Sequence, residues 1–370
     1  MVSRLLSALD ARIARTRDPL QHACLSAERA TLLARQGRLD EATSELDRIR
    51  ARYASKPNAV VTAWVCLGEG MVAFYASLAQ SARDKFMRAH ALSAAVENHE
   101  LRSLSSAWLA HLDYLEQSFE SMTDHLSSAL GASQDNQLSH ERCSLVVAQA
   151  YHWANRFDLA QPWYERARRC ATSLGDETLL SALMHNMAWL HMVEVRRRSL
   201  VGADKAKSVS SVLLSAEAIR NFDLLIGTAS LRTLVPMLQA HVLSVHEQYA
   251  EALQLFEEYL TSALSEGFAR IECSVFAEIA WCQINVGKVS EARALAISAQ
   301  EKLHQCNQPD ELAATHGRLA QTFRALGDAA AANLHQAQGA LEWERHHVRQ
   351  SKLVSLLSRL EVPDAYGQVG

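Results

Sequence analysis

Apolar residues recur along most of the chain at the three- and four-residue spacing of amphipathic helices. Near the N-terminus, Leu5, Leu6, Leu9 and Ile13 share one helical face. Short polar turns separate the segments that have this spacing. No stretch bounded by turn signals alternates apolar and polar residues with the two-residue period of a strand. The pattern therefore predicts an all-α protein.

The polar turns divide the chain into about eight predicted pairs of helices. Gly37 suits a helix end that needs a positive φ, and Asp40 and Glu41 suit the first turn of the helix that follows. The pairs are expected at 20–56, 58–97, 99–134, 138–175, 177–221, 223–266, 268–307 and from 309 onward. The last helix is predicted to continue from 329 to 361, ending before Pro363.

A small residue recurs at a spacing near forty within the first helix of each pair. These residues are Ala30, Gly70, Ala110, Ala148, Ala188, Ala240, Ala280 and Ala320. A second set follows twelve positions later, early in the second helix: Ala42, Ala82, Met122, Ala160, Ala252, Ala292 and Ala332. A period in this range is typical of repeat arrays. Small residues let two antiparallel helices approach closely, and each pair then leaves an apolar face for the next pair to cover.

The fifth pair is irregular. The interval from Ala188 to Ala240 is 52 residues, twelve more than forty, so the extra residues are expected near 196–207. This predicted insertion carries five basic residues: Arg196, Arg197, Arg198, Lys205 and Lys207. Two interpretations are open: a solvated connector, or a protruding loop that binds an acidic partner.

The predicted organisation has four parts. Residues 1–17 form an N-terminal capping helix, and residues 18–332 form the repeat array. Residues 333–362 form an extended C-terminal helix, and 363–370 a disordered tail.

The C-terminal helix carries an apolar stripe that Leu341 and Val348 extend backwards. The stripe consists of Leu353, Leu356, Leu357 and Leu360. It either caps the open end of the array or pairs with its copy in a homodimer.

Composition narrows the class of protein. Apolar residues make up 49% of 370 residues, enough for a continuous core, and the net charge is −4. This balance argues against nucleic-acid binding, which needs a basic face. The seven cysteines form no CxxC pair, and the N-terminus lacks the apolar core of a signal peptide, so a reducing, cytoplasmic location is expected.

The stretch from Ala59 to Ala79 is long enough to cross a membrane and carries one charge, Glu69. A central carboxylate would cost about 2.5–3.5 kcal/mol in a bilayer. Gly70 also falls in register with the repeat. We therefore expect a buried helix and no membrane.

Signatures of enzymes and metal sites are missing from the sequence. There is no glycine-rich phosphate loop, GxSxG, kinase set or HExxH, and His185 and His191, six apart, do not share a helical face. We expect no enzymatic activity, cofactor or metal. Glu69 and Glu278 lie within apolar helices, where a carboxylate is either catalytic or, more often, paired with a cation.

The second helices resemble those of tetratricopeptide repeats. The pattern is an alanine, an aromatic four residues later and an alanine three beyond, as in Ala160, Tyr164 and Ala167, and in Ala82, Phe86 and Ala89. The unit is near forty residues rather than 34, and the Trp-Leu-Gly and terminal Pro of that family are mostly absent. In this it is similar to the long repeats of bacterial sensor and regulator arrays, such as those of maltose-type transcription activators.

The resemblance implies a right-handed superhelical solenoid of antiparallel helix pairs whose first helices line a concave face. The residues expected to bind a protein or peptide there are Met71, Phe74, Tyr75, His111, Tyr114, Gln149, His152, Trp153, His185, Trp189, Met192, His241 and Trp281. Tryptophan, tyrosine and methionine are typical of binding surfaces, but the same side chains could instead pack together as core. The expected function is a non-enzymatic scaffold or regulatory adaptor; the alternative is a signal-peptide or small-molecule receptor that controls a separate output protein.

Overall fold

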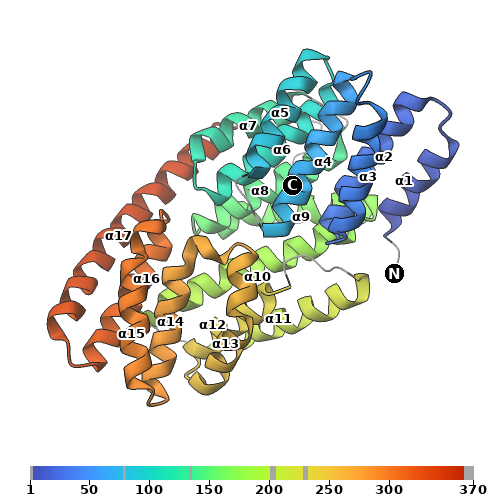
Figure 1. Ribbon diagram of the computed structural model, residues 1–370. Helices are drawn as coiled ribbons and strands as arrows, with labels where there is room; N and C mark the ends of the chain where they lie inside the picture. Colours follow the sequence, from blue (N-terminus) through green and yellow to red (C-terminus); the bar gives the residue numbers. More distant parts are fainter. Residues whose placement is uncertain (1–2, 78–80, 133–135, 201–205, 228–231, 362–370) are drawn as a thin grey trace. The chain divides into compact units, whose positions relative to one another are not determined.

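The fold is helical throughout the residues that the structure describes. A computed structural model describes residues 3–77, 81–132, 136–200, 206–227 and 232–361 (Figure 1). Within these ranges the chain forms α-helices and two short 3-10 helices, with no strand. The all-α prediction is therefore confirmed.

The chain forms two compact units. The first contains residues 1–183, 222–231 and 353–370, and the second contains 184–221 and 232–352. The division falls within the stretch predicted as a single array.

The first unit contains the N-terminal helices. They are α1 (Arg4–Arg15), α2 (Pro19–Arg35), α3 (Leu39–Arg52), α4 (Ala59–Ser77), α5 (Ser81–Ala95), α6 (His99–Leu115), α7 (Phe119–Ala132), α8 (Gln137–Trp153) and α9 (Phe157–Leu174). The first helices α2, α4, α6 and α8 contact one another in succession, and each packs against its own second helix. Each second helix up to α7 also touches the first helix of the next pair, so the unit has two layers of helices.

Helix α4 is apolar and long enough to cross a membrane by length and composition, and no other described helix is. It packs in the core of the first unit, where Gly70 is buried against the Phe86 ring of α5. Glu69 pairs with Lys85 at 2.5 Å and also with Arg50. The charge and the apolar side chains of α4 are thus matched by neighbouring helices.

The second unit contains the C-terminal helices. They are α12 (Leu234–Val245), α13 (Tyr249–Ser265), η1 (Phe268–Ile271), α14 (Glu272–Asn285), α15 (Val289–Glu301), η2 (Leu303–Gln305), α16 (Pro309–Ala325) and most of α17 (Ala329–Leu357). α12 and α14 contact each other, as do α14 and α16, and α12 to α15 form antiparallel pairs. α10 (Glu177–Leu200) and α11 (Ala206–Ile226) lie mostly in this unit.

The small residues behave as the repeat predicts. Ala30, Ala110 and Ala240 have no exposed surface, and the other members of the first set are also buried. All seven members of the second set are buried with 0% exposure. The recurrence therefore marks the places where paired helices meet.

The end of α10 and the start of α12 differ from the prediction. α10 continues to Leu200, so Arg196, Arg197 and Arg198 are helical and do not lie in a loop. Lys207 lies in α11, and Lys205 lies outside the described residues. α12 begins at Leu234 rather than near 223, because Pro236 has no N–H and fits only the first turn of a helix.

Helix α17 ends at Leu357, four residues before the predicted end. Leu353 and Leu357 are buried in the hydrophobic core of the first unit, and Leu356 and Leu360 pack against that core. The stripe therefore packs inside the protein, and Leu353 and Leu357 are not exposed for a dimer. The predicted tail at 363–370 lies outside the described residues.

Candidate functional site

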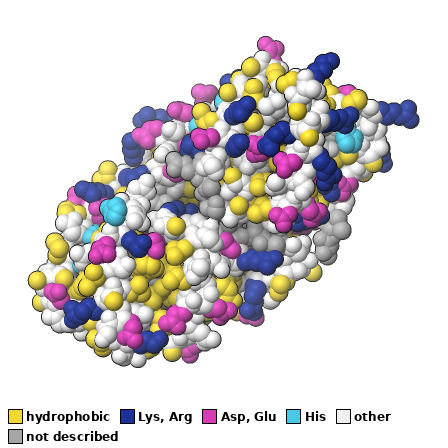
Figure 2. Space-filling view, viewed as in Figure 1, with side chains coloured by type: hydrophobic (Ala, Val, Ile, Leu, Met, Phe, Trp, Pro, Cys, Tyr) yellow, Lys and Arg dark blue, Asp and Glu magenta, His cyan; other side chains and the backbone are white. Residues whose placement is uncertain are grey.

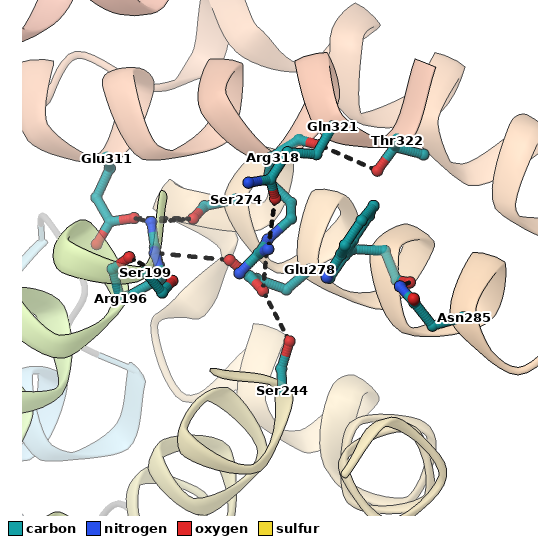
Figure 3. Close-up of polar contacts among 11 residues, drawn as sticks. Arg196, Ser199, Ser244, Ser274, Glu278, Asn285, Glu311, Arg318, Gln321 and Thr322 are labelled. Carbon is teal, nitrogen blue, oxygen red and sulfur yellow. Dashed lines mark hydrogen bonds and ion pairs between the residues drawn. The ribbon is translucent and has the colours of Figure 1, made fainter. Parts of the chain in front are cut away.

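Two arginines and two glutamates lie together in the interior of the second unit. Arg196 comes from α10, Glu278 from α14, and Glu311 and Arg318 from α16 (Figure 3). None is more than 5% exposed. We call this set the buried ion cluster; its two positive and two negative charges balance.

The geometry of the buried ion cluster joins three helices. Arg196 donates from Nη2 to Glu311 Oε2 at 2.8 Å and to Ser274 Oγ at 3.0 Å. Its Nε lies 3.7 Å from Glu278 Oε1, and Arg318 Nε lies 3.1 Å from Glu278 Oε2. Ser244 of α12 donates to the same carboxylate at 3.2 Å, so a fourth helix is attached.

These contacts keep Glu278 ionised. Burial raises the pKa of Glu278, but Arg318 and Arg196 lower it by more, so the net pKa is below the usual value. Burial lowers the pKa of Arg196, and Glu311 and Glu278 more than reverse this. Glu278 is therefore a counter-ion for two arginines, as the cation-pairing interpretation predicted.

His241 of α12 lies next to the cluster and is 1% exposed. Neither of its ring nitrogens has a hydrogen-bond partner in the described structure. Burial lowers its pKa to about 4, and the nearby Arg196 adds to this effect. The rings of Trp189 and Phe256 contact it edge-on, with centroids 6.1 and 5.2 Å away. His241 is thus a neutral core residue.

Trp281 connects the buried ion cluster to the surface. The Arg318 guanidinium lies 5.5 Å from the centroid of the Trp281 ring, and its Nη1 donates to Gln321 Oε1 at 2.7 Å. Tyr249 contacts Trp281 edge-on at 6.3 Å. Trp281, Gln321 and Tyr249 are all partly exposed. This places an indole ring at the surface with a buried arginine behind it.

Apolar side chains continue from Trp281. Val286 follows the end of α14 and is 37% exposed, and Val289 opens α15 and is 51% exposed. Asn285 is also exposed and donates to the Trp281 carbonyl at 2.8 Å. Hydrophobic side chains gather in this region of Figure 2, near the helices labelled α12 to α15 in Figure 1. We call Tyr249, Trp281, Asn285, Val286, Val289 and Gln321 the Trp281 face.

The first unit has a separate cluster of aromatic residues. Phe74 of α4 contacts Trp108 and His111 of α6, with centroids 5.4 and 5.5 Å apart. The Arg142 guanidinium covers the Trp108 ring at 3.8 Å. Burial and Arg142 lower the pKa of His111 well below its usual value. Together with Tyr75, these buried side chains form packed core.

A small cavity lies beside this aromatic cluster. Its volume is about 20 Å³, room for one water molecule. Arg35 and Glu141 are among the residues that line it, and Arg35 pairs with the buried Asp176 at 2.5 Å. Burial, and then Asp176, raises the pKa of Glu141 well above its usual value. The cavity is too small to hold a peptide side chain beyond a methyl group.

The predicted binding residues fall into two groups by exposure. The buried ones are Met71, Phe74, Tyr75, His111, Gln149, Met192 and His241. The partly exposed ones are Tyr114, His152, Trp153, His185, Trp189 and Trp281. The residues of the first group were expected to line a groove, but in the structure they are buried and form packed core. Neighbouring first helices approach closely enough to cover these side chains.

The predicted basic loop is also corrected. Arg196 is 2% exposed in the buried ion cluster, while Arg197 and Arg198 both pair with Glu194 one turn earlier, at 2.7 and 2.8 Å. Basic residues in the last turn of a helix are favoured by its dipole. These pairings explain why α10 extends through the arginines.

Sequence reasoning missed Arg318, Glu311 and Trp108. The sequence did place Glu311 and Arg318 on one face of a helix, because they are seven residues apart. A buried Glu278 needed cations, and only the fold shows that they come from α10 and α16.

Comparisons with known proteins support the fold. The chain matches a Rap protein, in a crystal structure where that protein is complexed with competence and sporulation factor. The TM-score is 0.56 and the sequence identity 12%; the match covers 91% of this chain and 100% of that one. No protein-family model and no curated protein matches the sequence. The chain thus shares the overall fold of that Rap protein, and its helices are paired as the repeat pattern predicted.

Proposed function

We propose that the protein is a non-enzymatic regulatory adaptor that binds a peptide or a protein segment on the Trp281 face. The observation that carries the proposal is the fold shared with a Rap protein that is complexed with a factor. Trp281 supports the assignment of the site, because tryptophan is enriched at binding hot spots and this ring is partly exposed beside Arg318.

The buried ion cluster would serve this function by fixing the floor of the face. Arg318 is held by Glu278 and supports both Trp281 and Gln321. A rigid indole loses little entropy on binding, which favours affinity. All seven cysteines are free, five of them buried, and we infer a reducing compartment such as the cytoplasm.

A peptide library displayed on phage and selected on the full chain tests the proposal. We expect selected sequences to carry apolar anchors. A fluorescein-labelled copy of one such peptide should bind the Trp281→Ala variant at least tenfold more weakly by fluorescence polarisation. The matched control is Trp163→Ala, a partly buried tryptophan of the first unit that also lies near an arginine.

Failure to enrich any peptide, or equal affinity for wild type and Trp281→Ala, would contradict the assignment. The alternative function is a small-molecule receptor in which a metabolite occupies the same face. A metabolite that raises Tm in wild type but not in Trp281→Ala, with no selected peptide, would favour that alternative.

A further inference from the structure

Helix α17 carries a row of exposed apolar side chains within the second unit. Leu334, Leu341 and Val348 are 56%, 50% and 64% exposed and are spaced by seven residues. Seven residues are close to two helical turns, so the three lie on one face. Exposed apolar side chains gathered on one face commonly mark a contact surface.

The row borders a groove between α17 and the start of α16. The groove has a volume of about 660 Å³ and is lined by Asn307, Pro309, Leu312, Leu341, Glu342, Glu344, Arg345, Val348 and Arg349. Four of its lining residues, Pro309, Leu312, Leu341 and Val348, are apolar, and such a groove can take the apolar side chains of a helix laid along α17.

Two charges stand between the apolar residues. Glu344 is exposed, and no cation pairs with it among the described residues. The Arg345 side chain is 68% exposed and pairs with Glu342 on its own helix. The order along the helix face is therefore apolar, acidic, basic, apolar.

We propose that this face binds a second copy of the chain, with the two α17 helices antiparallel and a two-fold axis between Glu344 and Arg345. About that axis Leu341 meets Val348 of the partner subunit, and Glu344 meets the partner subunit's Arg345. The two-fold operation repeats both contacts. A single helix face that complements itself in charge is what an isologous interface requires.

This interface uses only the backward extension of the predicted stripe, Leu341 and Val348, and none of the four leucines at its end. Leu353 and Leu357 are buried in the core of the first unit and are not available. Leu341 and Val348 lie earlier on α17 and on its exposed face. The dimer does not depend on the Trp281 face.

Sedimentation velocity of the full chain over a concentration series tests the proposal. Wild type should shift from a 41.0 kDa monomer to a dimer. Leu341→Asp should remain monomeric at every concentration, because it places a charge in the apolar contact. Leu214→Asp is the matched control, since Leu214 is a 67% exposed leucine on α11, and it should dimerise as wild type does.

Charge reversal distinguishes a second copy from any other partner. Glu344→Arg and Arg345→Glu should each raise the dimer Kd roughly tenfold, because two attractive contacts become repulsive. The double exchange should restore Kd to within about threefold of wild type. A wild-type chain that stays monomeric, a Leu341→Asp variant that still dimerises, or a double exchange without recovery would each overturn the proposal. Circular dichroism confirms that every variant is folded.

Discussion

Arg196 is among the largest fully buried side chains in the protein, and it carries a charge. Transfer of a guanidinium from water is costly unless its charge and its N–H groups are matched. Glu311, Glu278 and Ser274 supply that match. The charged residues of α10, α14 and α16 are therefore stable in the interior only because the other two helices supply the opposite charges.

We predict that Arg196→Met destabilises the protein by about 3–5 kcal/mol, because it leaves Glu311 as a buried, uncompensated carboxylate. Arg198→Met, two residues away, should cost less than about 1 kcal/mol, since its pair with Glu194 is exposed. Urea unfolding followed by circular dichroism measures both. Equal midpoints for the two variants would show that the cluster does not stabilise the fold.

His241 makes stability depend on pH. Its pKa is about 4 in the folded protein, against 6.5 when unfolded, so the unfolded chain binds the extra proton first. The stability it contributes is complete above pH 6.5 and is lost as pH falls from 6.5 to 4. Glu278 and Glu311 oppose this shift, but burial, Arg196 and Arg318 outweigh them.

We predict that His241→Phe loses about 3 kcal/mol less stability than wild type between pH 6.5 and 4. Phenylalanine suits the site because Trp189 and Phe256 already surround the ring. Urea titrations at several pH values measure the difference. His99→Gln, at an exposed histidine, should follow the wild-type curve, and a His241→Phe curve parallel to wild type would contradict the prediction.

At the scale of the element, α4 shows how the recurrent small residue works. A Cβ added at Gly70 would lie 2.5 Å from the ring of Phe86, which is fully buried and cannot move aside. Helix α4 therefore needs glycine at this crossing, although glycine is a poor helix former.

We predict that Gly70→Ala destabilises the protein by about 1–3 kcal/mol through overpacking. Gly131→Ala in α7 is the matched control, because no atom lies within 4 Å of its added Cβ. That change should be neutral or stabilising by up to about 1 kcal/mol. Thermal unfolding compares the two; a Gly70→Ala protein as stable as wild type would mean that α5 moves away freely.

Helical periodicity predicted most elements because one physical cause, the burial of a helix face, determines both the spacing and the fold. It failed where a specific contact decides the boundary. α10 extends because Arg197 and Arg198 pair with Glu194 and because Arg196 meets carboxylates from α14 and α16. Spacing along α10 carries no information about those distant carboxylates.

At the scale of the whole molecule, the division into two units was not visible in the sequence. Ala188 follows Ala148 at the usual spacing of forty residues, yet the boundary between the two units falls just before it, between Leu183 and Met184. The recurrent small residues indicate how the two helices of a pair pack together. They do not indicate how extensively one pair packs against the next.

The candidate site was predictable only in part. Trp281, Trp189 and Glu278 were identified from their positions on predicted first helices. Phe74 and His241 were assigned to the same face, but they lie in the interior. Tryptophan, histidine and methionine suit a binding surface and a core equally well, so residue type alone could not separate the two.

The turns inside the repeats have one further consequence. Glu247, Gly287 and Gly327 are forty residues apart, and each has a left-handed backbone, with φ of 65°, 83° and 79°. A repeat lost or gained between two such turns during evolution would rejoin the chain at equivalent geometry. Removal of 247–287, the segment between the first two of these turns, would nevertheless take Glu278 away from Arg196 and Arg318. Removal of 287–327 would likewise take Glu311 and Arg318 away from Arg196 and Glu278. The repeats are interchangeable in shape but not in charge, so neither the repeat with α14 nor the one with α16 can be lost without leaving buried charges unpaired.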